Sequence, residues 1–341
     1  MSHDPRTTGG WISNIAELEA CLGKSPGSGD LKVIDHLDEG AKRWLAASPL
    51  MFAGFGSNGS IAITLGGGAP GFAEIVGSTR LRVATALLDA PESAQEGCSI
   101  GALFLVPGLG ETLRVNGRVV AVNGSGIEVG VEECYVHCAK SLIRSGFWSA
   151  APQEQVSSAI TEFLPAARFL ALATIDDNGR ADVSPKGDPA GLMIRLSQEA
   201  AWFADRPGNR RADSFRNILT QPRVAIAALV PGMTQVVALG GHARLSTSGE
   251  IRSTFTVREK SPHLVTCVES PDVQLYNSAS LTRARLWPAP QSSEIDAAAV
   301  VTQHVKLSKS RGLQATLARA VLSIPGMMQK GLDRDYRNNL Y

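Results

Sequence analysis

Apolar residues occur along most of the chain in short runs separated by turn residues, which is the pattern of β-strands. A hairpin is predicted at Asp176-Asp-Asn-Gly179, because Asn-Gly favours the type I′ turn, in which both central residues have positive φ. The predicted strands are 50–55, 60–65, 80–87, 101–106, 112–122, 126–131, 168–175, 181–184, 192–196, 200–204, 224–229 and 235–245.

Helical spacing is confined to a few segments. Apolar residues from Val33 to Leu45 predict a helix that ends at Ser48-Pro49. After Pro290 the chain has the pattern of amphipathic helices, for which docking onto the rest of the protein is favoured over a role at a membrane surface. The other predicted helices are 11–22, 155–164, 213–219 and, within this last part, 294–322.

Two repeated sequence motifs indicate that one domain is present twice. Leu-Val-Pro-Gly occurs at 105–108 and again at 229–232, and Ser-Leu-x-Arg followed by Trp occurs at 141–148 and at 280–287. A duplicated domain can do alone what a homodimer does. We therefore predict a tail with a short helix (1–30), repeat 1 (31–150), repeat 2 (151–290) and a helical extension (291–341).

Composition narrows the fold class and the partners. Of the 341 residues, 44% are hydrophobic, and 34 Gly with 18 Pro favour short strands and tight turns. Five to six antiparallel strands per repeat predict a mainly β (α+β) protein of two small barrels. A net charge of +1 argues against a nucleic-acid partner.

The N-terminus and the cysteines indicate the compartment. Residues 1–10 lack an apolar signal core and no run of about 18 apolar residues occurs, so we expect a cytoplasmic protein without a membrane partner. The five cysteines are expected to be reduced thiols. Cys134 and Cys138 have no second cysteine pair nearby, so no metal site is predicted.

Basic residues gather around a Pro-Gly-Asn turn in repeat 2. Arginine, lysine and serine side chains beside the free amides of a helix N-terminus are how proteins hold a phosphate dianion. The alternative is a solvated charged loop with Asp213 as an ordinary N-cap, but the accompanying Gly, Asn and Ser favour the phosphate site. The residues concerned are Ser184, Lys186, Arg206, Arg210, Arg211 and Ser214.

The two repeats keep different halves of this site. The corresponding stretches of repeat 1, 63–71 and 87–97, contain no Lys or Arg, and the second holds three acids that would repel a phosphate. Repeat 1 instead has a basic set that repeat 2 lacks, with Ala279 where Lys140 stands. This set, spaced to share one face of a helix or turn, is His137, Lys140, Arg144 and Trp148.

These motifs resemble those of the FMN-binding split-barrel proteins related to pyridoxamine 5′-phosphate oxidase, and most closely a bacterial subgroup of largely unassigned activity. The resemblance covers about residues 31–287 and rests on Ser-Pro-Lys-Gly-Asp at 184–188, with Lys where Arg is usual, and on Arg-Pro-Gly-Asn-x-Arg-x-Asp-Ser-x-x-Asn at 206–217. It also rests on Val-Pro-Gly…Glu-Thr-Leu-Arg-Val-Asn-Gly-Arg at 106–118 and on His-Cys-Ala-Lys…Arg-Ser…Trp at 137–148.

The resemblance implies two tandem split β-barrels that form a pseudo-dimer, either as a monomer or as a dimer of pseudo-dimers. It also implies one FMN at the interface of the repeats. The phosphate and ribityl chain would be held by Ser184, Lys186, Arg206, Asn209, Arg211, Ser214 and Asn217. The site would be closed from repeat 1 by Glu111, Lys140, Arg144 and Trp148.

The function implied is that of an FMN-dependent oxidoreductase acting on a small organic molecule. Reduced NAD(P)H, a deazaflavin or the substrate itself would supply electrons, and the sequence assigns no catalytic acid or base. The alternative is a flavin- or haem-binding module that senses or stores without turnover. Oxidation of pyridoxamine phosphate itself is disfavoured, because the chain is much longer than that enzyme and lacks its substrate-phosphate signature.

Overall fold

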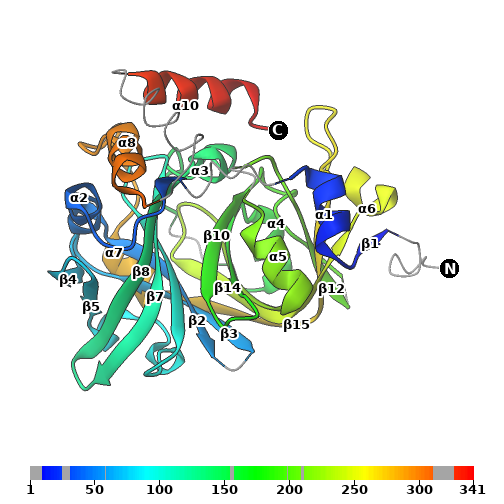
Figure 1. Cartoon of the computed structure of the whole chain (residues 1–341). Coiled ribbons are helices and arrows are strands. Elements are labelled where there is room, and N and C mark those ends of the chain that lie inside the picture. The colour runs from blue at the N-terminus through cyan, green and yellow to red at the C-terminus, as the bar shows by residue number, and fades with distance from the viewer. Residues whose placement is uncertain are drawn as a thin grey trace.

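The computed structural model describes residues 10–24, 31–57, 59–153, 157–197, 199–208, 211–309 and 326–341. Each half of the chain forms one antiparallel sheet that curls into a barrel (Figure 1). The sheet of repeat 1 contains, in spatial order, β3 (Ser60–Gly67), β2 (Leu50–Ser57), β6 (Ser99–Leu105), β7 (Thr112–Asn123), β8 (Gly126–His137), β5 (Arg80–Val83) and β4 (Ala73–Gly77).

The sheet of repeat 2 has the same strand order. It contains β10 (Ala181–Gly187), β9 (Phe169–Ile175), β13 (Arg223–Leu229), β14 (Gln235–Ser246), β15 (Val265–Asn277), β12 (Ala200–Ala204) and β11 (Arg195–Leu196). An additional strand, β1 (Trp11–Ile12), pairs with β14. Each strand of repeat 1 therefore has a counterpart seven strands later, which confirms the mainly β fold class and shows that the two halves share one topology.

The middle strands are buried on both faces, because each repeat packs against the other as well as around its own core. Along β2, Met51 lies in the core of repeat 1 whereas Phe52 lies in a separate cluster between the repeats. Along β9, Leu170 lies in the core of repeat 2 and Phe169 in the same shared cluster, 5.5 Å from Phe52 between ring centroids. Alternate side chains point to opposite faces of a strand, so continuous apolar runs supply both cores at once.

The helices flank the two barrels (Figure 1). Helix α8 packs on the core of repeat 1 through Val300 and Val301, and α1 packs on the core of repeat 2 through Leu18. The helices are α1 (Ile15–Leu22), α2 (Glu39–Ala47), α3 (Lys140–Arg144), α4 (Ile160–Ala166), α5 (Asp213–Thr220), α6 (Gly249–Ser253), α7 (Ala279–Ala284), α8 (Ala297–Leu307) and α10 (Met327–Asn338), with short 3-10 turns η2 (Thr85–Leu87) and η3 (Pro91–Ser93).

Several local predictions were wrong: the strand predicted at 80–87 ends at Val83, that predicted at 192–196 begins at Arg195, and β4 was not predicted. Three further errors have a clear local cause. The helix predicted at 11–22 begins at Ile15, because Trp11 and Ile12 pair with the edge of β14. The helix predicted from Val33 begins at Glu39, because Ile34 exchanges backbone hydrogen bonds with Cys134 of β8.

The third concerns the turn at 176–179: the predicted hairpin is confirmed, since β9 and β10 pair on either side of it, but the turn type differs. Gly179 has φ +72°, but Asn178 is not among the residues with positive φ, so the turn is not of type I′. The Asp176 carboxylate instead accepts from the backbone amides of Asn178 and Arg180, which fixes a longer hairpin loop.

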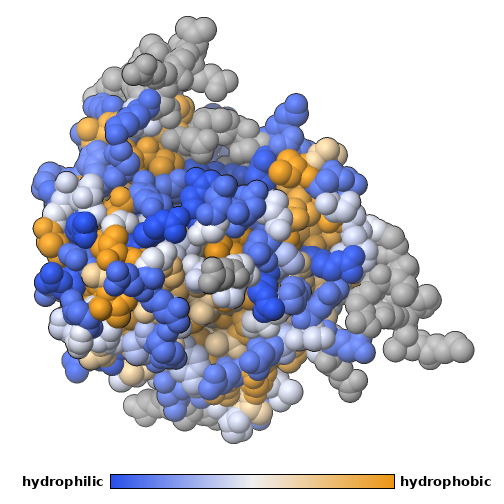
Figure 2. All heavy atoms as spheres, turned by 60° about the horizontal axis from the view of Figure 1, so that its bottom comes forward, coloured by the Kyte–Doolittle hydropathy of each residue, from blue (hydrophilic) through white to orange (hydrophobic). Residues whose placement is uncertain are grey.

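The exterior is mixed in character. The face turned forward in Figure 2 intersperses hydrophilic and hydrophobic side chains. Among the described residues, no helix is both long enough and apolar enough to cross a membrane. All five cysteines are free thiols.

Candidate functional site

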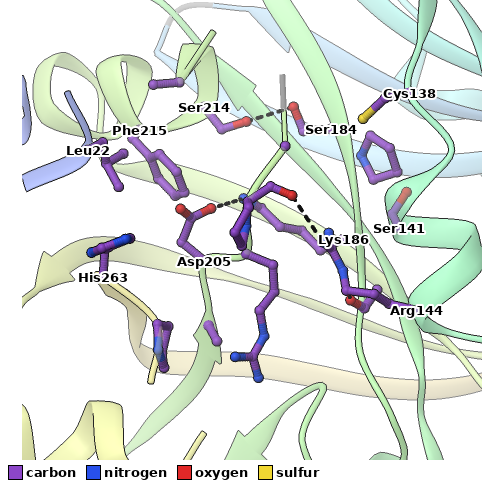
Figure 3. A pocket seen from close by; sticks show the side chains of 18 of the residues that line it. Leu22, Cys138, Ser141, Arg144, Ser184, Lys186, Asp205, Ser214, Phe215 and His263 are labelled. Carbon is purple, nitrogen blue, oxygen red and sulfur yellow. Dashed lines mark hydrogen bonds and ion pairs between the residues drawn. The ribbon is translucent and has the colours of Figure 1, made fainter. Parts of the chain in front are cut away.

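A cavity of about 430 Å³ lies between the two repeats and is lined by both. Its walls include Cys138 and Arg144 from repeat 1, and Lys186, Asp205 and Phe215 from repeat 2 (Figure 3). His137 of repeat 1 also lines it. Six cationic side chains and two carboxylates line the described part of this interface cavity. The cavity is therefore suited to an anionic ligand.

One end of the interface cavity is built on the start of α5. The chain enters this helix through Ala212, whose φ of +57° is left-handed, and no described side chain caps the N-terminus. The Ser214 hydroxyl donates to the Ser184 hydroxyl at 2.9 Å, which joins the helix to the middle of β10 (Figure 3). Hydroxyls and helix N-terminal amides converge here in the manner of a phosphate site.

Arg211 crosses from repeat 2 to repeat 1. Its guanidinium lies 4.8 Å from the ring centroid of Tyr135 on β8, and its Nε donates to Asp213 at 2.7 Å. Arg114 and Lys32 face the same ring, at 5.3 and 5.8 Å. Three cations thus surround one tyrosine beside the start of α5.

Arg114 joins the two barrels at the floor of the interface cavity. It is 1% exposed, and its Nη1 donates to Asp182 at 2.6 Å and to the Tyr135 hydroxyl at 2.7 Å. Its Nη2 donates to Ser184 at 3.0 Å, whereas its Nε has no described partner. Burial lowers the pKa of Arg114, but the charges of Asp182 and Asp213 and the Tyr135 hydroxyl together outweigh this effect, and the net shift is upward.

Arg144 is half-buried and keeps its positive charge beside the interface cavity. Its guanidinium donates to three carbonyls, those of Gly187 (2.9 Å), Pro207 (3.0 Å) and Leu340 (2.7 Å). Burial lowers its pKa, although an arginine stays protonated at any physiological pH. Since its partners are neutral carbonyls, its charge is available to an anion.

Lys186 and Asp205 form the centre of the floor, 3.5 Å apart (Figure 3). Burial lowers the pKa of Lys186 and raises that of Asp205, while each charge partly offsets the shift of the other. Arg206, also in the lining, pairs with the buried carboxylate of Asp188 at 2.7 Å. Its charge is therefore already compensated.

The structure brings six of the predicted residues to the interface cavity: Ser184, Lys186, Arg206, Arg211, Ser214 and Arg144. It places four others outside the lining. Asn217 is buried and donates to Thr174, and Trp148 donates from Nε1 to the Leu109 carbonyl while its ring packs on Phe147. Lys140 pairs with Asp335 at 2.8 Å, and Glu111 accepts from the Tyr336 hydroxyl. Asn209 and Arg210 lie outside the described residues.

The prediction that His137, Lys140, Arg144 and Trp148 share one helix face was wrong. Helix α3 spans only Lys140–Arg144, and His137 still belongs to β8. His137 and Arg144 therefore face the interface cavity, whereas Lys140 faces α10.

Sequence reasoning missed several residues around the interface cavity. Lys32 had no motif of its own, but burial lowers its pKa to about 8, in the company of Cys138 and two arginines. Burial, with the Arg114 and Lys32 charges, keeps the pKa of His137 well below its ordinary value, so its ring is neutral at pH 7. Arg114 stood within a quoted motif, and its position in Thr-Leu-Arg-Val was the available signal.

A second position, related by the duplication, has the same framework. Arg283 of α7 donates from Nε to the Gly67 carbonyl at 2.9 Å, as Arg144 of α3 donates to Gly187. A Cβ on Gly67 would lie 2.5 Å from the Ser280 carbonyl oxygen, and one on Gly187 would lie 1.9 Å from that of Ser141. The close approach of helix turn to strand explains glycine at both places.

This second position is filled by the chain itself. Residues 87–90, which we call the plug loop, lie across β3, where the register places Gly66 and Thr64 at the positions of Lys186 and Ser184. Asp89 donates its amide to Leu65, and its carboxylate accepts from the Ser278 hydroxyl (2.5 Å) and the Ser280 amide (2.8 Å). The plug loop therefore occupies the space and the donors that an anion would need.

The filled and open positions also differ in the hydrogen bonding of one serine hydroxyl. Ser280 donates its hydroxyl to the carbonyls of Leu65 and Leu87, the latter in the plug loop. Its counterpart Ser141 is 3% exposed, lines the interface cavity, and its hydroxyl has no described partner. A buried hydroxyl without a partner is unfavourable, so the open position lacks an acceptor that the filled one has.

Two barrels of identical strand order, enclosing one basic cavity between them, define a protein of two split barrels. Residues 156–285 match the family described as pyridoxamine 5′-phosphate oxidase. This match spans most of repeat 2 and supports a fold of the flavin-binding oxidoreductase type.

Solved structures show similarity over about one repeat. HupZ of Group A Streptococcus is 17% identical, and the match covers 35% of this chain and 93% of that one at a TM-score of 0.28. An F420 reductase is 16% identical over 36% and 98%, at 0.27. A pyridoxamine 5′-phosphate oxidase-related, FMN-binding protein from Nostoc punctiforme is 16% identical over 41% and 87%, at 0.23. No curated protein matches the chain.

Proposed function

We propose that the chain binds one FMN in the interface cavity and is an FMN-dependent oxidoreductase acting on a small organic molecule. The observation that carries the proposal is the contrast between the two related positions. One is open, basic and lined in part by polar groups that have no partner among the described residues, and the other is closed by the plug loop. The family match of repeat 2 supports the choice of a flavin.

The residues present fit the group. Ser184, Ser214 and the amides at the start of α5 would hold the phosphate, with Arg211 as its charged partner. The Ser141 hydroxyl and the Arg114 Nε have no described partner and would gain acceptors. A volume of about 430 Å³ lies within the range of about 300–1,000 Å³ typical of small-molecule sites.

Bound FMN would supply the redox chemistry at its ring, with NAD(P)H or another small molecule as electron donor. The chain would supply position and polarity. Arg144 and Lys186 place uncompensated or weakly compensated positive charge at the floor and the repeat 1 wall. In a desolvated cavity such charge interacts strongly with an anion. Because one chain supplies both halves, we propose that the functional unit is the monomeric pseudo-dimer.

Titration of purified protein with FMN, followed by absorbance and fluorescence, tests the proposal. We expect about one FMN per chain, then anaerobic bleaching by NAD(P)H and recovery of the colour in air. Binding of two FMN per chain, or none, would contradict the site. A protein that binds FMN but is reduced by no nicotinamide or other donor would be the non-catalytic flavin module instead.

A further inference from the structure

Residues 326–341 lie against the outer side of α3, at the edge of the interface cavity (Figure 1). The Asp335 carboxylate of α10 pairs with the Lys140 ammonium at 2.8 Å. The Tyr336 hydroxyl donates to Glu111 at 2.8 Å and accepts from the Ala139 amide at 3.2 Å. These contacts engage two of the four residues that the sequence resemblance assigns to closing a flavin site.

The end of the same segment reaches across to repeat 2. The Leu340 carbonyl accepts from Arg144 at 2.7 Å, and the Tyr341 carbonyl accepts from Lys260 at 2.9 Å. The Tyr341 ring lies 5.7 Å from the Arg206 guanidinium and lines the interface cavity. The segment therefore begins on repeat 1 and ends on repeat 2, beside the ligand space.

The burial of the Lys140 side chain indicates that it holds α10 in place. Its side chain is 3% exposed, whereas that of Asp335 is 43% exposed. A buried ammonium is strongly disfavoured without its counter-charge, so α10 is held where Lys140 needs it. Lys140 is absent from the cavity lining, and a ligand there would meet Tyr341 and Arg144 instead.

We propose that residues 335–341, which we call the closing wall, form one side of the ligand site, with Tyr341 as a residue that contacts the ligand. Lys140 and Glu111 are positioning residues that hold the closing wall and do not touch the ligand. The proposal rests on the interface cavity being the ligand site of the proposed function. It gives Lys140 and Asp335 the same role, although their charges are opposite.

The direction in which one substitution changes FMN binding distinguishes a positioning role of Lys140 from direct contact with the ligand. Asp335→Asn releases the Lys140 ammonium, which would tighten FMN binding if Lys140 were a phosphate ligand. If Lys140 holds the closing wall, Asp335→Asn and Lys140→Met should each speed FMN release about tenfold, because loss of one partner of a buried pair acts mainly on dissociation. Release is measured by stopped-flow fluorescence after dilution, with Asp333→Asn, an exposed carboxylate of the same helix, as the matched control.

A second readout needs no flavin. Cys138 lines the interface cavity and is a half-buried free thiol, so its alkylation rate by iodoacetamide, followed by peptide mass spectrometry, reports access to the cavity. In ligand-free protein we expect faster alkylation in Asp335→Asn and Lys140→Met than in wild type or Asp333→Asn. The charge-swapped variant K140D/D335K should restore slow alkylation and slow release.

Slower FMN release in Asp335→Asn would overturn the proposal, as would wild-type alkylation and release in both single variants. Failure of wild-type protein to bind FMN would remove the proposed function. The alkylation rates would then still decide whether the closing wall shields the interface cavity.

Discussion

Replacement of Arg114 by methionine should destabilise the protein by about 3–5 kcal/mol, the usual cost of breaking a buried ion pair. The value follows from the surroundings of the guanidinium, which is 1% exposed and donates to Asp182, Tyr135 and Ser184. In Arg114→Met the Asp182 carboxylate stays buried and keeps the Ser184 hydroxyl at 3.1 Å as a donor. The penalty arises from the stranded carboxylate, not from a lost attraction alone.

The rescue variant identifies this cause. Arg114→Met/Asp182→Asn replaces the stranded charge by a neutral amide, and we expect it to recover stability to within about 1–2 kcal/mol of wild type. Urea unfolding at pH 7, followed by tryptophan fluorescence, measures both. Arg118→Met is the control on the same strand, because its pairing with Glu132 is at the surface and should contribute less than about 1 kcal/mol.

The pH dependence provides an independent check. Burial raises the pKa of Asp182 even with the Arg114 charge beside it, and loss of that charge should raise it further. A carboxyl group with a raised folded-state pKa binds its proton more tightly when folded, so its cost is present at neutral pH and declines as the pH falls through that pKa. The deficit of Arg114→Met should therefore shrink on acidification. An unchanged deficit, or a double variant no more stable than the single one, would refute the reasoning.

Three further outcomes are expected. Arg211→Ala should weaken FMN binding about 10- to 100-fold through loss of a charge-assisted contact, measured by fluorescence titration, whereas exposed Arg223→Ala should match wild type. FMN affinity should fall as the pH rises through about 8, because burial lowers the pKa of the Lys32 ammonium to about 8 and it then loses its proton. Lys32→Met should remove this pH dependence. If the pH dependence of FMN affinity is the same in Lys32→Met as in wild type, the Lys32 charge does not act on the ligand. Asp89→Ala should cost about 2 kcal/mol of unfolding free energy, measured by urea unfolding, yet leave the FMN stoichiometry at one; a gain of a second FMN would mean that the carboxylate alone blocks the other position.

The strand pattern was largely predictable from the sequence, because apolar runs of five to eight residues are what strands buried on both faces require. The 13-residue strand β15 was missed. It carries Pro271 and alternates half-buried with exposed residues after Val268, which weakens any hydrophobic signal. The helix expected from Val33 failed for a tertiary reason, since Ile34 pairs with a strand 100 residues later.

The residues of the candidate site also fall into a group that could be predicted from the sequence and a group that could not. Ser184, Lys186, Arg211 and Ser214 could be found because motifs local in sequence remain local in space. The partners of Lys140 and Glu111 could not, since Asp335 and Tyr336 are about two hundred residues away and belong to no recognisable motif. The role of Asp89 could not be predicted either. Its charge alone does not show that it fills the second position through its hydrogen bonds to Leu65, Ser278 and Ser280.

The plug loop also makes the two related positions unequal. In a symmetric homodimer, every residue that closes one position is present at the other as well, so a chain carrying Asp89 at that place would have closed both. A closed pair would leave nothing for a ligand. Only a single polypeptide that carries two different barrels can close one position and keep the other open.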